Sequence, residues 1–142
     1  MHLSQPVAAA PPATRTPDTA PTAPVVRHPP WPGSVAHPDT PGFERSAKAW
    51  LFDLGPARWQ CEGVFHRRPD ELARMVRLYI ESELATAQTA LHRIRLLRTS
   101  PDNGELLDFC QRESNWATAM RDQVREVEAA LRQRRMARGK AS

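Results

Sequence analysis

The stretch PDELARMVRLYIESELATAQTALHRIRLL (residues 69–97) decides the fold of this 142-residue chain. Along it, mostly apolar positions recur at alternating steps of three and four residues: Ala73, Val76, Ile80, Glu83, Ala87, Ala90, Ile94 and Leu97. Such steps average about 3.5 residues, the repeat of an α-helix that keeps one seam against a partner helix. The stretch therefore predicts a long helix packed along another helix, as in a coiled coil.

The partner helix follows directly in the chain. A second seam with the same steps runs through Leu106, Cys110, Glu113, Ala117, Met120, Val124, Val127 and Leu131. Only TSPDNG (residues 99–104) separates the two segments, and a short connection makes neighbouring helices antiparallel. The sequence thus predicts an antiparallel helical hairpin of helices 69–98 and 101–136. Glu83 and Glu113 interrupt the seams, and we expect each to reach solvent or pair with an arginine.

Local signals mark where the two helices start. Pro69 suits a first helical position, and Asp70 and Glu71 after it place negative charge near the positive end of the helix dipole. Ser100 is suited to cap the second helix, with Pro101 at its first position, while Asn103-Gly104 leaves a later start, up to Glu105, open.

A shorter helix is predicted before the hairpin, over residues 44–54. The run FERSAKAWLFDL (residues 43–54) brings Ala47, Trp50, Leu51 and Leu54 to one helical face. A two-helix hairpin alone leaves much of its apolar face in water, so we expect this helix to pack across it.

The connection between the short helix and the hairpin has no clean period. Gly55-Pro56 ends the short helix, and residues 57–66 (ARWQCEGVFH) read as an irregular connection or a short helical turn. We expect Trp59, Val64 and Phe65 to fold back on the hairpin. The result is an all-α, three-helix domain over about residues 43–136, with residues 137–142 as the end of a basic tail.

The first 42 residues have a different composition. Eleven of the 14 prolines lie there, with few charges and Trp31 as the one aromatic residue. Such a segment buries too little apolar area to offset the entropy of ordering its backbone. We therefore expect residues 1–42 to form a disordered arm rich in proline and alanine, with polyproline II character.

One stretch combines cations with a helix start: VFHRRPDEL (residues 64–72). Arginine beside tryptophan is typical of interaction hot spots. The sequence therefore suggests a recognition site made by five residues: Trp50, Trp59, Arg67, Arg68 and Arg74. The competing interpretation is that the tryptophans are core and that the arginines pair with Asp53, Asp70 and Glu71.

Signatures of catalysis are not evident. The chain contains no phosphate loop, no dinucleotide fingerprint and no HExxH or GxSxG motif. The intervals between Cys61, His66, His92 and Cys110 match no zinc finger or ribbon. We expect no catalytic residue, metal site or cofactor, and we do not expect an enzyme.

The C-terminal residues carry the positive charge. RQRRMARGKAS (residues 132–142) has five cations and no acid: Arg132, Arg134, Arg135, Arg138 and Lys140. Cations are favourable at the C-terminal end of a helix dipole, which is the structural interpretation. The same run could contact phosphates or an acidic surface weakly and without sequence selectivity, so nucleic-acid binding stays open.

Other features concern the compartment. Two cysteines are too few for a disulfide scaffold and fit a reducing cytoplasm. No apolar run approaches the roughly 20 residues that span a bilayer, so we expect no membrane segment.

The run AWLFDLGPARWQCEGVFHRRPDELARM (residues 49–75) resembles a group of uncharacterised actinobacterial helical proteins. Their pattern is W-L-x-D-L-x-P, followed by an aromatic residue and then by R-R-x-P-x-x-L-A-R. The matching residues here are Trp50, Leu51, Asp53, Leu54, Pro56, Arg68, Pro69, Leu72, Ala73 and Arg74. The order His66-Arg67-Arg68-Pro69 departs from the more usual arginine-arginine-histidine-proline. The resemblance implies no activity.

These features favour a non-enzymatic, helical protein–protein interaction module with a regulatory or adaptor role. The alternative is a nucleic-acid-associated protein that uses the basic C-terminal tail. For the partner, the sequence leaves a homodimer and a monomer that binds another protein equally open.

Overall fold

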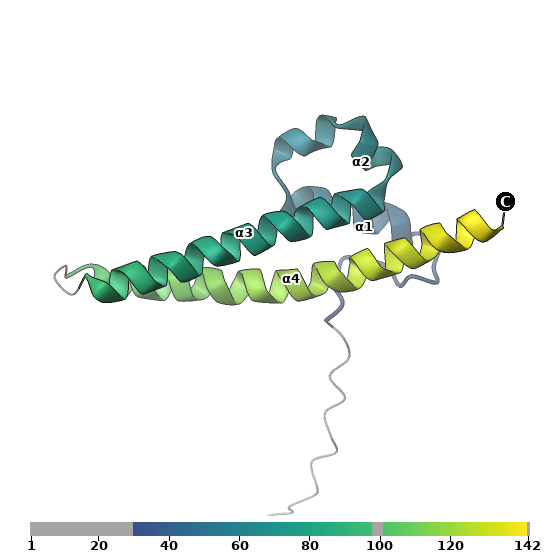
Figure 1. Cartoon of the computed structure of the whole chain (residues 1–142). Coiled ribbons are helices and arrows are strands. Elements are labelled where there is room, and N and C mark those ends of the chain that lie inside the picture. The colour runs from purple at the N-terminus through teal and green to yellow at the C-terminus, as the bar shows by residue number, and fades with distance from the viewer. Residues whose placement is uncertain (1–29, 98–100, 142) are drawn as a thin grey trace, which may run out of the picture.

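The computed structural model describes residues 30–97 and 101–141, and every regular element in them is helical. The elements are α1 (Phe43–Leu54), the 3₁₀ helix η1 (Ala57–Cys61), α2 (Gly63–Arg67), α3 (Pro69–Leu96) and α4 (Asn103–Lys140). The two long helices α3 and α4 run antiparallel, with α1 packed against one end of the pair (Figure 1). The predicted all-α fold with a hairpin and a shorter helix on it is confirmed.

The start of α3 follows the predicted local chemistry. Pro69 is its first residue, and the Arg68 carbonyl accepts hydrogen bonds from the amides of Glu71 and Leu72. The start of α4 differs from the expected residue 101, because the helix begins at Asn103. Ser100, the expected cap, lies outside the described residues. The Asn103 side-chain amide instead donates to the carbonyl of Leu97 at the end of α3.

The interface between α3 and α4 is mostly apolar, but several positions of the expected seams are not buried in it: Glu83, Ala90, Ile94 and Leu97 on α3, and Leu106, Glu113 and Met120 on α4. On α3 the buried positions are Pro69, Leu72, Ala73, Val76, Ile80, Leu84, Ala87 and Leu91. On α4 they are Cys110, Ser114, Ala117, Val124, Val127, Glu128 and Leu131. Leu84 and Ser114 thus take the places that were expected for Glu83 and Glu113. The reason is geometric: an α-helix of 3.6 residues per turn drifts about 20° per heptad from a strict 3.5-residue seam.

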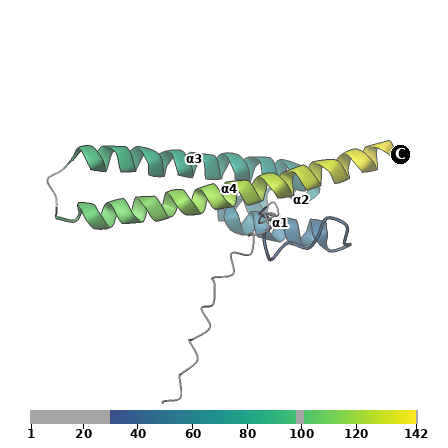
Figure 2. The same cartoon turned by 90° about the horizontal axis from the view of Figure 1, so that it is seen from below.

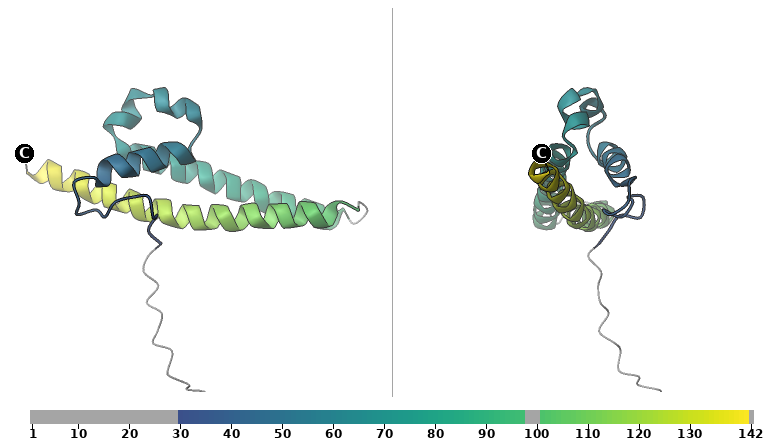
Figure 3. Two further views of the ribbon diagram at one scale, coloured as in Figure 1. Left: turned by 180° about the vertical axis from the view of Figure 1, so that it is seen from behind. Right: turned by 90° about the vertical axis from the view of Figure 1, so that its right-hand side faces the viewer.

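The short helix α1 buries Phe43, Ala47, Leu51 and Phe52 against the hairpin. Trp50 and Leu54 pack at the edge of the same core. Seen along the hairpin, α1 lies to one side of both long helices (Figure 3, right).

The connection after α1 contains two short helical turns, in line with the second of its two expected forms. Its aromatic side chains do fold back: Trp59 lies 5.7 Å from Phe65 and 5.8 Å from Tyr79 of α3, between ring centroids. Val64, which was expected to fold back with them, is exposed instead. Gly55 makes this return possible. A Cβ atom there would lie 3.0 Å from the Trp59 ring and 3.5 Å from Val76.

The expected arm ends earlier than predicted, because residues 30–42 pack against the helices. Val35 is buried, and Trp31 donates its indole N–H to the Val35 carbonyl at 2.9 Å. The Ala36 amide donates to the Ser46 hydroxyl oxygen, also at 2.9 Å, and the Trp31 ring contacts Phe43. The average composition of residues 1–42 did not indicate these contacts, because only a few residues make them. Residues 1–29 lie outside the described part.

The other end of the chain is more helical than expected, since α4 continues to Lys140 instead of stopping at residue 136. Its last turns extend past the start of α3 (Figure 2). Arg138 is held there by Glu44 of α1, with Nη2 and Oε2 2.9 Å apart. Within the described residues, no helix has both the length and the apolar character that crossing a membrane requires.

Candidate functional site

The three arginines of the suggested recognition site are mostly explained by contacts within the fold. Arg68 Nη2 lies 3.1 Å from Asp70 Oδ2 and 3.2 Å from Glu71 Oε1. Arg74 Nη1 lies 3.6 Å from Glu71 Oε2. The Arg67 guanidinium lies next to Gly63, where an added Cβ would be 2.9 Å from its Nη1. Pairing with the acids that begin α3 was the competing interpretation, and it describes Arg68 and Arg74.

The two tryptophans do not meet these arginines. Trp59 contacts aromatic rings, and Trp50 lines a separate hollow with residues of α1 and the preceding loop. Across the described residues, no hydrogen bond, ion pair or ring contact joins either tryptophan to an arginine. Recognition by Trp50, Trp59, Arg67, Arg68 and Arg74 therefore stays a prediction, without a shared surface that brings the five together.

The basic tail is largely engaged within the molecule. Arg132 Nη2 lies 2.7 Å from Glu128 Oε1, and Arg135 Nη1 lies 3.5 Å from Asp70 Oδ1. Arg138 pairs with Glu44. The Arg134 guanidinium carbon stands 5.9 Å from the Phe43 ring centroid. Lys140 is exposed at the end of α4. The tail thus fastens α4 to α1 and to the start of α3, and nucleic-acid contact by it stays a prediction.

A buried charged network, which no pattern in the sequence predicts, links the two long helices. Glu128 of α4 is only 5% exposed, and its Oε2 accepts a hydrogen bond from Arg77 Nε at 2.7 Å. This bond raises the pKa of Arg77, so the guanidinium stays charged. Arg77 also bonds Glu81, which pairs with Arg125 of α4. No sequence pattern marks a pair 51 residues apart.

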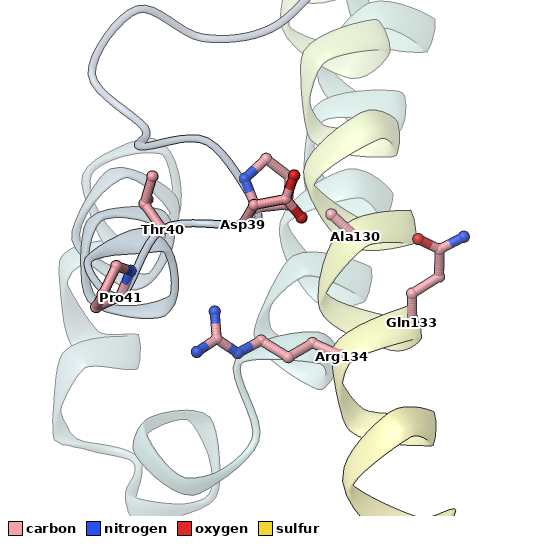
Figure 4. A pocket seen from close by; sticks show the side chains of 7 residues that line it. Asp39, Thr40, Pro41, Ala130, Gln133 and Arg134 are labelled. Atoms are coloured by element: carbon pink, nitrogen blue, oxygen red, sulfur yellow. The ribbon is translucent and has the colours of Figure 1, made fainter.

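One open hollow in the described part of the chain is not built for chemistry. It has a volume of about 500 Å³ and lies between the turn at residues 38–41 and α4. Figure 4 shows Asp39, Thr40 and Pro41 on one side and Arg134 reaching toward them from the helix. It is open to solvent, and its lining has one acid, one cation and no nucleophile beside a base. Among the described residues, no cluster of His, Cys, Asp or Glu could hold a metal ion.

A second hollow lies in the half of the hairpin that α1 leaves uncovered. We call this half, α3 from Ser82 to Leu96 and α4 from Asn103 to Met120, the distal half; no third helix among the described residues covers it (Figure 3, left). The hollow has a volume of about 340 Å³ and a mostly apolar lining. We call it the distal groove; its lining is Glu83, Thr86, Ala87, Ala90, Phe109, Cys110 and Glu113.

The distal groove continues the face that α1 and its connection cover at the other end. On α3, the covered positions Leu72, Val76 and Tyr79 continue at steps of four and three to Glu83, Thr86 and Ala90. Residues at these steps share one helix face. The face is therefore continuous along α3, and its first half is buried beneath Trp59 and α1.

Large apolar side chains are exposed along the distal half. Phe109 is 51% and Trp116 is 42% exposed, and Leu106 and Leu96 are also exposed. Isolated exposed apolar residues are common, but a run of them beside an apolar groove is typical of an interaction surface.

The ion pairs of the described hairpin residues are also confined to one half of the hairpin, the half that α1 covers. Within residues 30–97 and 101–141, every ion pair lies outside the distal half. Arg93 and Glu113 thus make no ion pair there. The Glu83 carboxylate beside the Tyr79 phenol raises the pKa of that phenol, through hydrogen bonding and through its charge. The distal half therefore has an apolar groove bordered by charged side chains, and these side chains make few contacts with opposite charges among the described residues.

Comparison with known proteins does not assign this arrangement: no family model, curated protein or solved structure matches the chain.

Proposed function

We propose that the chain is a non-enzymatic, helical protein–protein interaction module with an adaptor or regulatory role. The distal groove is the observation that carries this proposal. Two antiparallel helices hold an apolar groove between them, with small residues on its floor and aromatic side chains beside it. An amphipathic helix of a partner can lie in such a groove, just as α1 lies against the other end of the hairpin.

Small floor residues determine how closely a partner can approach. Ala87 and Ala90 leave room for a side chain between the long helices, while Phe109 stands at the groove edge. Tryptophan, tyrosine and arginine supply much of the binding energy at protein interfaces. Trp116 and Arg93, which makes no ion pair within the part of the chain that the structure describes, are placed to contribute such contacts.

A capture experiment with the full chain tests this proposal. Ala90→Glu places a carboxylate on the groove floor, and Gln88→Glu places the same group two positions away on another side of α3. We expect the wild type and Gln88→Glu to retain one defined partner that Ala90→Glu loses, with all three thermal melts alike. Equal capture by the two variants would remove the groove from the proposal.

The alternative, a nucleic-acid-associated protein, is less favoured by the contacts of its tail. Arg132, Arg135 and Arg138 each pair with an acid, which lowers the charge available to phosphates. Salt-titrated binding to duplex DNA and single-stranded RNA discriminates between the two functions. Strong binding that falls steeply with salt, and falls again on Arg135→Ala with Arg138→Ala, would support the alternative instead.

A further inference from the structure

We propose that the occupant of the distal groove is the distal half of a second copy of this chain, laid antiparallel to the first across a two-fold axis. This inference rests on the proposed function, because it names the partner of the same groove. It follows from the continuity of the covered face, from the room left along the hairpin and from the placement of unpaired charges.

The covered end of the hairpin limits how two copies can meet. The cover over α3 reaches Tyr79, which the Trp59 ring contacts, and α3 ends at Leu96. The uncovered length between Ile80 and Leu96 is about 24 Å at 1.5 Å per residue. If two copies faced each other in the same direction, each α1 would meet the other. In the opposite direction, each covered end lies beyond the tip of the other hairpin, and the two uncovered lengths coincide.

This arrangement fixes the register of the contact. The midpoint of the uncovered length lies at Gln88, so the two-fold axis passes near that level of α3. Residues equally far from the midpoint then face each other across the axis. Glu83 and Arg93 are each five positions from Gln88, so Glu83 of one copy lies opposite Arg93 of the other, and the pair occurs twice.

The charges of Glu83 and Arg93 agree with this register, which follows from the uncovered length of α3 alone. Arg93 has no ion pair among the described residues, and Glu83 has no cation partner there. Opposite charges across a symmetric interface fix its register and select against other pairings. The two pairs supply to each arginine a partner that residues 30–97 and 101–141 of its own chain do not provide.

The apolar contacts follow from the register between the helices of one hairpin. Arg77 meets Glu128 and Glu81 meets Arg125, which places Gln88 of α3 at about the level of Ala117 and Thr118 on α4, next to Trp116. Trp116 therefore lies beside the two-fold axis, and the Trp116 side chains of the two copies come together. Phe109 lies farther from the axis, along the same face. Burial of both aromatic residues supplies the apolar part of the contact.

Analytical ultracentrifugation of the full chain tests the proposal. We expect a concentration-dependent dimer between about 1 and 100 µM, the range in which a short helical interface dissociates. Either Glu83→Arg or Arg93→Glu alone places like charges together twice and should raise the dissociation constant about tenfold. The double variant Glu83→Arg with Arg93→Glu restores opposite charges and should return it to within about threefold of the wild type.

The results of the ultracentrifugation experiment can be distinguished from those of the capture experiment. A chain that stays monomeric over the whole range overturns the second-copy proposal, while loss of a different captured partner on Ala90→Glu would still support the interaction module. A dimer that neither single charge variant weakens also overturns the inference, because its contact then lies elsewhere. Arg95→Glu, with an exposed cation outside the groove lining, is the matched control and should leave the dimer unchanged.

Discussion

The Nε–H of Arg77 on α3 donates to the carboxylate of Glu128 on α4 across 2.7 Å, in the middle of an otherwise apolar interface. Glu128 is buried, and its other carboxylate oxygen, Oε1, lies 2.7 Å from Nη2 of Arg132, one turn later on α4. Removal of one partner from a buried pair leaves an uncompensated charge, whereas replacement of both partners by apolar side chains does not.

Arg77→Ala is therefore expected to lower the free energy of unfolding by about 2–4 kcal/mol. Arg125→Ala is the control, since Arg125 is more than half exposed and pairs with Glu81 near the surface; it should cost less than about 1 kcal/mol. Urea denaturation measures both. If the double replacement Arg77→Met with Glu128→Leu destabilised as strongly as Arg77→Ala, loss of the hairpin packing and not the stranded charge would be the cause.

Gly55→Ala should destabilise the chain by about 1–2 kcal/mol, because the new methyl group meets the Trp59 ring at 3.0 Å and the ring has Val76 and Tyr79 beside it. Gly104→Ala is the same chemical change, but it is expected to raise the stability of the chain. Gly104 lies in the first turn of α4 with nothing near its Cβ position, so alanine there should stabilise by about 0.5–1 kcal/mol. Thermal or urea melts of the two variants, compared with the wild type, decide whether Gly55 is needed for close approach.

Val35→Ala should lower the free energy of unfolding by about 1–2 kcal/mol, because Val35 is part of the apolar core although it precedes the first helix. An exposed alternative nearby, Ser34→Ala, should leave stability unchanged to within about 0.5 kcal/mol. Equal urea midpoints for the two variants would show that residues 30–42 do not contribute to the folded domain.

The single tyrosine gives a direct test of the boundary between the covered and uncovered faces. Hydrogen bonding to Glu83 is the main reason that the pKa of Tyr79 is raised above its usual value near 10, followed by the Glu83 charge and burial. A phenol whose pKa is higher in the folded state contributes stability that is present below pH 10 and is lost as the pH rises through the folded pKa.

Glu83→Gln should therefore bring the pKa of Tyr79 down toward the usual value, and stability above pH 10 should then decrease less steeply. Ultraviolet absorbance follows the phenolate without interference from other tyrosines, since the chain has one. Glu81→Gln, on another side of α3 and bonded to Arg77, should leave the Tyr79 titration where it is. An unchanged Tyr79 pKa in Glu83→Gln would contradict the hydrogen bond.

The helices themselves could be predicted because their signals are local. The start at Pro69, the end near Gly55 and the steps of three and four lie within a few turns of each residue. The choice between Glu83 and Leu84 as the buried position was not accessible in the same way. Both fit a seam, and the actual crossing of the two helices decides between them.

The site was less predictable than the fold. Nothing in the sequence marks Glu128 as buried, because its partner Arg77 is 51 residues away, and nothing shows that Arg134 stands over Phe43. The distal groove depends on where α1 stops covering the hairpin, which is set by the turn at Gly55 and by Trp59. Only the residues that line it, such as Ala87 and Ala90, were visible as small members of the predicted seam.

Site-specific photo-crosslinking in intact cells of the native host tests the central claim, that the distal groove is the interaction surface, most directly. A photoreactive side chain is placed at Ala90 on the groove floor or at Gln88, and the adduct is identified by mass spectrometry. The account predicts one discrete adduct from position 90 that position 88 does not give, whether the captured protein is a second copy of the chain or another one. No adduct from position 90, or the same adducts from both positions, would contradict it.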